Sequence, residues 1–138
     1  MNRLDELEAQ SIYILREAFA RWNAGERTVD MDTVDSEVEL HTPLASTRGA
    51  PYRGHEGMRQ WLADIDGQFE VWELQVEDWR DLEDGRVMGL GAIHAQGRGS
   101  GVELDQPMAW IFAFREGKVI RYDAFYSHAE GLRAAGLE

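Results

Sequence analysis

Four histidines are the side chains of this sequence best suited to acid–base chemistry near neutral pH. His41 ends a short predicted strand beside Pro43, and His94 lies within a longer one. His55 begins a predicted helix and His128 lies near the last one, so we expect surface or capping roles for both. The four lie on separate elements, with no His-x-x-x-His or carboxylate–histidine pair at ligand spacing. We therefore predict no metal and no cofactor.

Other familiar chemistries lack the residues that they need. The chain has no cysteine, which excludes a thiolate nucleophile, a disulfide and a zinc–cysteine site. No serine lies in a Gly-x-Ser-x-Gly elbow. The glycine-rich segment Gly97–Gly101 joins two predicted strands and opens no helix, which is typical of a hairpin and not of a phosphate-binding loop.

The charge of the chain argues against two classes of partner. The formal net charge is −12, and Lys118 is the single lysine. Nucleic acids and anionic membranes are bound by clustered lysines and arginines, so we expect neither as a partner. No apolar run approaches the roughly 18 residues that span a bilayer, and the charged start of the chain does not resemble a signal peptide. We predict one cytoplasmic domain over residues 1–138.

The first half of the chain is predicted to be mostly helical. In residues 3–23, apolar side chains recur every three or four positions, which is typical of an amphipathic helix, and Asn23-Ala24-Gly25 ends it. The segments that follow are predicted as a short helix (28–36), a strand (38–42), a loop (44–53) and a third helix (54–67).

In the second half of the chain, apolar and polar residues alternate as is typical of β-strands. Trp72, Leu74 and Val76 alternate with polar residues, and Asp84-Gly85 and Glu116-Gly117 are typical of turns that join antiparallel neighbours. Helices followed by a long antiparallel meander indicate an α+β fold. The predicted strands cover residues 69–80, 86–96, 102–115 and 118–126, and a short helix closes the chain.

Three segments, taken in order, resemble a known family: Trp22-Asn23-Ala24-Gly25, residues 51–57 and residues 112–120. The pattern resembles the SnoaL-like branch of the NTF2-like superfamily, which includes ketosteroid isomerases and limonene epoxide hydrolases. The resemblance implies a cone in which a strongly curved mixed or antiparallel sheet wraps around the N-terminal helices, with an apolar pocket at the wide end. It also implies a homodimer, but no single activity, because members include cyclases, isomerases, hydrolases, dehydratases and binding modules.

The catalytic residues of two relatives are not matched. Ketosteroid isomerases use a carboxylate base and two acidic donors, and an epoxide hydrolase of the limonene type uses an Asp-Arg-Asp set. Ala124 stands where one of those aspartates would lie. Arg121 and Asp123 alternate onto the face opposite Tyr122, where an exposed ion pair is the competing interpretation. The positions that correspond to the isomerase groups hold Ala18, Thr42 and Trp110.

A polyketide cyclase of the SnoaL kind needs an acid/base group inside the cone, and His41 fits that role best. We predict His41 as the catalytic acid/base and Tyr122 and Tyr126 as hydrogen-bond donors. The role requires His41 to point into the cone, and the alternative is a rim histidine that binds backbone. His94 is expected to face outward.

The resemblance also implies which side chains line the pocket. Gly89 and Gly91 are expected to leave space between larger residues, and Ile120 is expected to face inward with Tyr122. Such a pocket suits a flat, mostly apolar molecule, aromatic or polyketide-like. The same side chains could instead form a filled core. The predicted ligand-binding residues are Trp22, Thr42, Met58, Trp61, Trp110 and Phe112.

Two functions from different classes follow. The first is a cyclase, isomerase or dehydratase that acts on such a substrate by acid–base chemistry without metal. The second is a non-catalytic ligand-binding or dimerisation module, which the missing carboxylates favour; a protein-interaction role like that of nuclear transport factor 2 is a third option. An apolar outer face with Ile111, Ala113 and Phe125 favours the homodimer.

Overall fold

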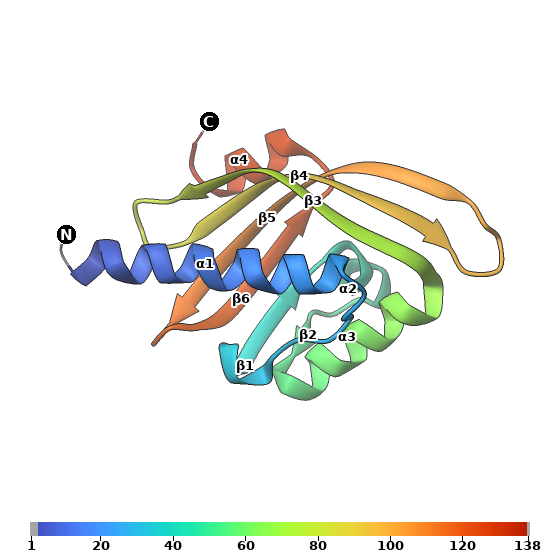
Figure 1. Cartoon of the computed structure of the whole chain (residues 1–138), viewed down its shortest axis with the longest axis horizontal. Helices are drawn as coiled ribbons and strands as arrows, with labels where there is room; N and C mark the ends of the chain where they lie inside the picture. The colour runs from blue at the N-terminus through green and yellow to red at the C-terminus, as the bar shows by residue number, and fades with distance from the viewer. Residues whose placement is uncertain (1–2, 138) are drawn as a thin grey trace.

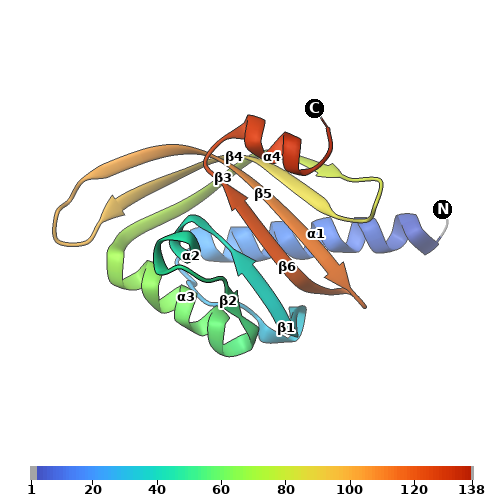
Figure 2. The same ribbon diagram turned by 180° about the vertical axis from the view of Figure 1, so that it is seen from behind.

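The computed structural model describes the backbone of residues 3–137 and the side chains of residues 11–137. Over these residues the chain forms four α-helices, one 3-10 turn and six strands (Figure 1; Figure 2). In chain order the elements are α1 (Arg3–Asn23), η1 (Met31–Thr33), β1 (Val34–His41), α2 (Pro43–Arg48), β2 (Tyr52–Arg53), α3 (Gly54–Gln68), β3 (Phe69–Asp81), β4 (Val87–Gly97), β5 (Glu103–Arg115), β6 (Lys118–Phe125) and α4 (His128–Ala134).

The six strands form one sheet in the order β2-β1-β6-β5-β4-β3. Strands β1 and β6 run parallel, and the other neighbours run antiparallel. The sheet curls around α1 and α3, while α4 lies against its other side (Figure 1; Figure 2). This arrangement confirms the predicted α+β cone and its mixed sheet.

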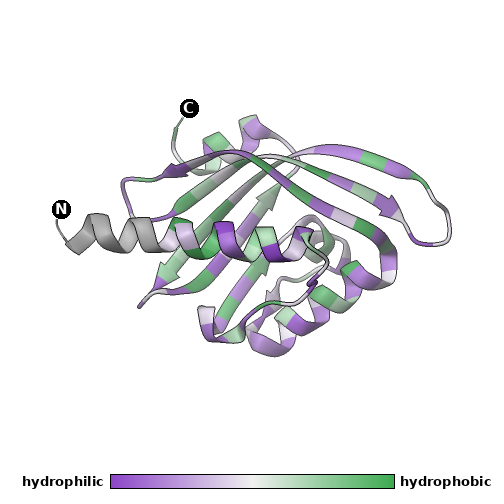
Figure 3. Cartoon of the chain, in the orientation of Figure 1, coloured by the Kyte–Doolittle hydropathy of each residue, from purple (hydrophilic) through white to green (hydrophobic). Residues whose placement is uncertain are grey.

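Side-chain alternation gives the sheet an apolar cluster on each face, and it appears as banding along the strands in Figure 3. The larger cluster fills the concave face and includes Trp110 and Phe112. The smaller one lies beneath α4 and includes Met88 and Ile111. Ile111 is only 2 % exposed, so it is not part of an outer face open to a partner. The homodimer stays a prediction.

The end of α1 is hydrogen-bonded to β3, which is one of the two edge strands of the sheet. The indole N–H of Trp22 donates to the carbonyl of Trp72 at 2.6 Å. The Asn23 amide donates to the carbonyl of Leu74 at 2.6 Å and accepts from its N–H at 2.9 Å. These bonds occupy backbone groups that an edge strand would otherwise present to another chain. They also hold the end of α1 against β3 on the concave side of the sheet.

Tyr52 anchors α3 against the opposite edge. Its side chain is 2 % exposed, and its hydroxyl donates to Asp64 Oδ2 at 2.6 Å. Burial, and then the hydrogen bond and charge of Asp64, raise the pKa of Tyr52 to about 12, so the phenol is neutral at pH 7. Helix α3 approaches Tyr52 closely at Gly57, where a Cβ would lie 2.9 Å from the Tyr52 carbonyl carbon. Segment 51–57 therefore positions α3 beside the cone interior.

The prediction of a helix over residues 28–36 is wrong. That segment holds the 3-10 turn η1 and the first residues of β1, which begins at Val34. Val34 pairs with Val119 of β6, a contact between residues far apart in sequence that outweighs the local pattern.

The prediction of a loop over residues 44–53 is also wrong, because α2 and β2 lie there. The Thr42 hydroxyl accepts from the N–H of Ala45 at 3.1 Å and caps α2, with Pro43 at the first turn. Gly49, with φ of 87°, ends the helix in the left-handed conformation.

Candidate functional site

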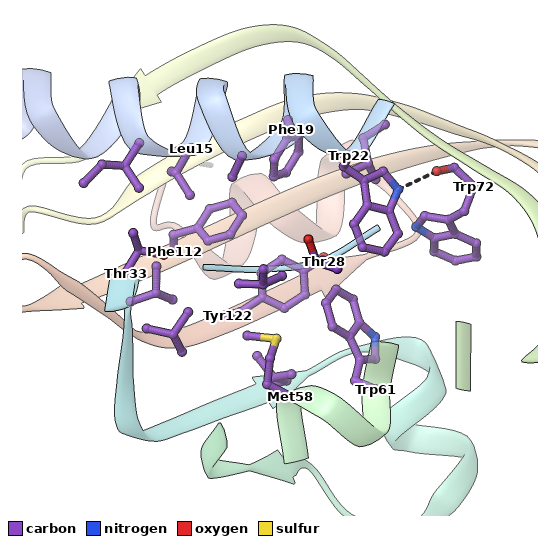
Figure 4. A pocket seen from close by; sticks show the side chains of 17 residues that line it. Leu15, Phe19, Trp22, Thr28, Thr33, Met58, Trp61, Trp72, Phe112 and Tyr122 are labelled. Atoms are coloured by element: carbon purple, nitrogen blue, oxygen red, sulfur yellow. Dashed lines mark hydrogen bonds between the residues drawn. The ribbon is translucent and has the colours of Figure 1, made fainter. Parts of the chain in front are cut away.

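An apolar cavity of about 100 Å³ lies inside the cone, between α1, α3 and the concave face of the sheet (Figure 4). Of the 17 residues that line it, Thr28, Thr33 and Tyr122 carry hydroxyl groups. The others are aliphatic or aromatic, and none of the 17 carries a carboxylate, imidazole, amine or guanidinium group. The cavity therefore offers apolar surface and a few hydrogen-bonding groups, but no strong acid or base.

Tyr122 is the most distinctive polar group of the cavity. Its ring packs against Phe112 and Trp61, with centroid distances of 5.0 and 5.5 Å. Burial raises the pKa of the Tyr122 hydroxyl, and a hydrogen bond with Trp110 partly offsets this rise. A phenol hydroxyl can donate its own proton and also accept at its oxygen. Tyr122 is thus a neutral phenol that can donate to a ligand.

A second, smaller hollow of about 30 Å³ adjoins the cavity. The two hollows share three aromatic residues, Trp61, Trp72 and Tyr122. The smaller hollow is also lined by Trp110 and Tyr126. Burial raises the pKa of the Tyr126 hydroxyl, so this phenol is neutral at pH 7 as well.

An open groove of about 730 Å³ lies on the outside, between α2 and the end of β6. Tyr126 lines both this groove and the smaller hollow, and it is 51 % exposed. His41 and Asp123 line the groove and neither inner hollow. The groove thus carries the ionisable side chains that the interior lacks.

His41 does not point into the cone, contrary to what its predicted role requires. Val38 and Leu40 are the buried, inward residues of β1, and His41 lies on the other face with Glu39. His41 Nε2 is 2.9 Å from Glu39 Oε1, and this bond is the main cause that lowers the pKa of the Glu39 carboxyl. The partner of His41 is a side-chain carboxylate, not the backbone of the competing interpretation.

The sequence profile of the SnoaL-like domain matches residues 15–122, which is most of the chain and includes every element from α1 to β6 in part or whole. The chain belongs to the SnoaL-like domain family. No curated protein matches the sequence.

Solved structures share the NTF2-like fold of this SnoaL-like domain at low sequence identity. An NTF2-like protein from Burkholderia pseudomallei K96243 superposes with a TM-score of 0.75 and 13 % identity, covering 90 % of this chain and 95 % of its own. Bal32a, from a soil-derived mobile gene cassette, has a TM-score of 0.75 and 21 % identity over 91 % and 95 %. TerC, co-crystallised with polyporic acid, has a TM-score of 0.72 and 16 % identity over 92 % and 98 %.

The SnoaL-like domain brings most of its predicted site residues to the two hollows. Thr42 reaches the smaller hollow, although its hydroxyl already accepts the capping bond of α2. The predicted residues that line the larger cavity are Trp22, Met58, Trp61, Phe112 and Tyr122, and those that line the smaller hollow are Thr42, Trp61, Trp110, Tyr122 and Tyr126.

Two glycines expected to leave room for a ligand do not do so. A Cβ at Gly89 would meet the ring of Trp79 at 3.2 Å, and one at Gly91 would overlap the carbonyl of Gln75. The register of β3 against β4 shifts between Val76 and Asp78, so a bulge brings the β3 backbone close to Gly91. Gly89 and Gly91 therefore allow β3 to pack closely against β4 and do not provide space for a ligand.

Ile120 does not face inward, contrary to the prediction. The register of β5 against β6 shifts so that Ala113 pairs with Arg121 and Phe114 with Val119. Ile120 is the extra residue of this bulge, and Val119 takes its place in the concave cluster.

The remaining histidines and the outer arginine have structural partners. His94 faces outward, as predicted, and its Nδ1 is 2.7 Å from Asp105. His55 and His128 each bind a backbone carbonyl at 2.8 Å. Arg121 bonds Asp123 at 2.9 Å on the outer face, as the ion-pair interpretation expected. Among residues 11–137, no three histidine or acidic side chains gather as a metal site would need.

Sequence reasoning missed Trp72 and Thr28 as lining residues. Trp72, Leu74 and Val76 alternate with polar residues on β3, so the inward orientation of Trp72 was visible. Its place at the cavity follows from the hydrogen bond that joins α1 to that strand. Thr28 lies in the segment predicted as a helix, which hid it. Among the described helices, none has the length and apolarity that crossing a bilayer requires.

Proposed function

We propose that this SnoaL-like domain binds a small molecule with a flat, mostly apolar ring in the cavity under α1, with Tyr122 as the hydrogen-bond donor. The observation that carries the proposal is the lining of the cavity: aromatic and aliphatic side chains surround a single buried phenol. Pockets of this composition suit apolar ligands that carry one or two polar atoms.

The size of the cavity limits the ligand. Its volume of about 100 Å³ is somewhat smaller than the ~150 Å³ of an engineered apolar cavity that binds benzene. A single six-membered ring is therefore the largest unit that fits with little adjustment of the side chains.

The chemistry of Tyr122 sets the polar end of the ligand. Because its pKa is raised, the phenol stays protonated at neutral pH and donates to a carbonyl or phenolic oxygen. TerC, which has the same fold, was crystallised with polyporic acid, and this supports a small organic ligand for the present chain.

Calorimetric titration with phenol tests the proposal. Replacing Tyr122→Phe removes one neutral hydrogen bond, worth about 1 kcal/mol, so the affinity for phenol should fall by roughly fivefold. The matched control is Tyr13→Phe, because Tyr13 is 63 % exposed and lines neither hollow. Equal affinities of the wild type and the Tyr122 variant, or no heat of binding at all, would contradict the proposal.

One observation favours a second function, an acid–base cyclase, isomerase or dehydratase that works without metal. The imidazole of His41 is held by a carboxylate, as in many general bases, and it shares the outer groove with Tyr126. A substrate that protrudes from the smaller hollow into the groove would present its polar part to both side chains. His41 would take a proton, and Tyr126 would donate to the carbonyl.

This second function can be tested with 2-tetralone, a two-ring ketone with exchangeable protons next to its carbonyl. If His41 acts as a base, the wild type should accelerate exchange of these protons into deuterated water, as followed by NMR. The His41→Asn variant should not. Equal rates with both proteins would exclude His41 as the base for this probe and leave binding as the supported function.

A further inference from the structure

We infer that the cavity and the smaller hollow are two parts of one elongated site, closed between them by the indole of Trp61, and that this site takes molecules with two fused or directly linked rings. The inference rests on the proposed function and deepens it. It names Trp61 as the residue that determines ligand length.

The wall between the two hollows consists of side chains. The residues that line both are Trp61, Trp72 and Tyr122, each of them aromatic. A wall made of side chains opens by rotation about side-chain bonds and needs no change in the sheet or helices. Rotamer changes at binding sites are common even where the backbone moves little.

Trp61 is the member of this wall with the fewest restraints. Tyr122 is only 9 % exposed and packs against Phe112. The Trp72 ring packs on Phe69 at 4.6 Å, and the Trp72 backbone carries the bond from α1. Trp61 is half-buried, projects from the surface helix α3 and meets Tyr122 by a tilted ring contact at 5.5 Å. Figure 4 shows its indole at the side of the cavity beside Trp72.

The smaller hollow also adjoins the outside. It shares Thr42, Pro43, Ala124 and Tyr126 with the outer groove. Tyr126 follows the last residue of β6 and is half exposed. A ligand therefore enters from the groove past Tyr126, occupies the smaller hollow and reaches the cavity once Trp61 moves.

The volumes show why the indole must move. The cavity of about 100 Å³ is near the ~150 Å³ that holds one benzene ring and admits one ring with little adjustment of its side chains, whereas the hollow of about 30 Å³ is too small for another. A second ring fits only in the space that the Trp61 side chain now occupies. The protein thus accepts one ring with Trp61 in place and two rings with Trp61 displaced.

The experiment compares phenol, with one ring, and 2-naphthol, with two fused rings. The indole N–H signals of the five tryptophans are recorded by NMR in the wild type, and the Trp61 signal is identified by its absence in Trp61→Phe. We expect 2-naphthol to move the Trp61 signal further than phenol does, because only the larger probe displaces the indole. The Trp79 signal should change little with either probe, because Trp79 lines neither hollow.

Affinities supply the second readout. If the open conformation of Trp61 is populated at about 10 % or less, the apparent affinity for 2-naphthol falls by about tenfold or more. Trp61→Ala removes this loss, so the variant should bind 2-naphthol at least about tenfold more tightly. The matched control is Leu74→Ala, because Leu74 lines the cavity but not the smaller hollow. It enlarges the cavity without joining the two hollows, so its gain in 2-naphthol affinity should be smaller than that of Trp61→Ala. If Trp61→Ala does not fold, Trp61→Phe should show the same direction with a smaller gain.

Two results would overturn the inference. One is an equal gain in 2-naphthol affinity for Trp61→Ala and Leu74→Ala, which would show that volume alone matters. The other is 2-naphthol binding to the wild type that leaves the Trp61 signal in place. Failure of the proposed function is distinct from both, because it appears as phenol binding that is absent or independent of Tyr122.

Discussion

The two faces of strands β1 and β6 differ in polarity and in the residues that they expose. On the concave face, Leu40 and Tyr122 line an apolar cavity. On the convex face, one residue further along each strand, His41 and Asp123 lie opposite each other in the register and line an open groove. Neighbouring positions of the same strand therefore belong to a hydrophobic interior and to a charged exterior.

The difference shows that the enclosed cavity and these ionisable side chains lie on opposite faces of the sheet. The carboxylate–imidazole pair of Glu39 and His41 and the Arg121–Asp123 ion pair lie on the outer side of the sheet. The enclosed volume lies on the inner side, where Tyr122 supplies the buried phenol. A ligand held inside the cone meets hydrogen-bond donors, and it reaches a base only if part of it extends into the groove.

The largest expected effect comes from replacing neighbours on β1. Leu40 is 1 % exposed, so Leu40→Ala should lower the free energy of unfolding by about 4 kcal/mol through lost burial and a new void. His41→Ala removes a half-exposed pair with Glu39 and should cost less than about 1 kcal/mol. Urea denaturation of both variants gives the comparison. Similar losses would show that the two faces of β1 are not as different as described.

A second change asks whether the small residues of β4 serve the ligand or the fold. Gly91→Ala places a Cβ against the carbonyl of Gln75, so we expect a loss of about 3 kcal/mol in the free energy of unfolding. Gly67→Ala in α3 is the control, because its Cβ meets nothing within 4 Å, and a gain of up to about 1 kcal/mol is expected. A Gly91 variant as stable as the wild type would mean that this position does have free space.

The smallest effect concerns a histidine on the convex face. The hydrogen bond that His94 donates to the Asp105 carboxylate raises the pKa of His94, so the protonated form is favoured in the folded protein. Because the folded pKa lies above the unfolded value of about 6.5, the stability that this pair adds is fully present below that value. It is lost as the pH rises through the folded pKa. NMR titration should give His94 a higher pKa in the wild type than in the Asp105→Asn variant. Equal His94 pKa values in the two proteins would contradict the role given to Asp105.

Much of the fold could be predicted from the sequence because local residue patterns indicate most of its helices, strands and turns. The helical periodicity of α1 and α3 and the turns Asp84-Gly85 and Glu116-Gly117 give nearly the observed boundaries. The short helix α2 was missed, although a capping threonine followed by proline and a later glycine, Thr42, Pro43 and Gly49, marks such a helix. The parallel pairing that begins β1 at Val34 depends on distant contacts and leaves no local signal.

The site was predictable in composition and less so in orientation. The aromatic residues expected in the pocket do line the hollows, because the strands that carry them alternate regularly. His41 was misplaced, even though Val38 and Leu40 already occupy the inward positions of its strand. The register shifts at Gly91 and Ile120 arise from pairing between strands, which one strand's sequence does not reveal.

A crystal structure of the protein soaked with phenol tests the central claim most directly. If the concave cavity is the binding site, phenol should occupy the space under α1, with its oxygen about 2.7–2.8 Å from the Tyr122 hydroxyl. Phenol bound instead in the outer groove beside His41, with the cavity empty, would contradict the account and move the site to the convex face.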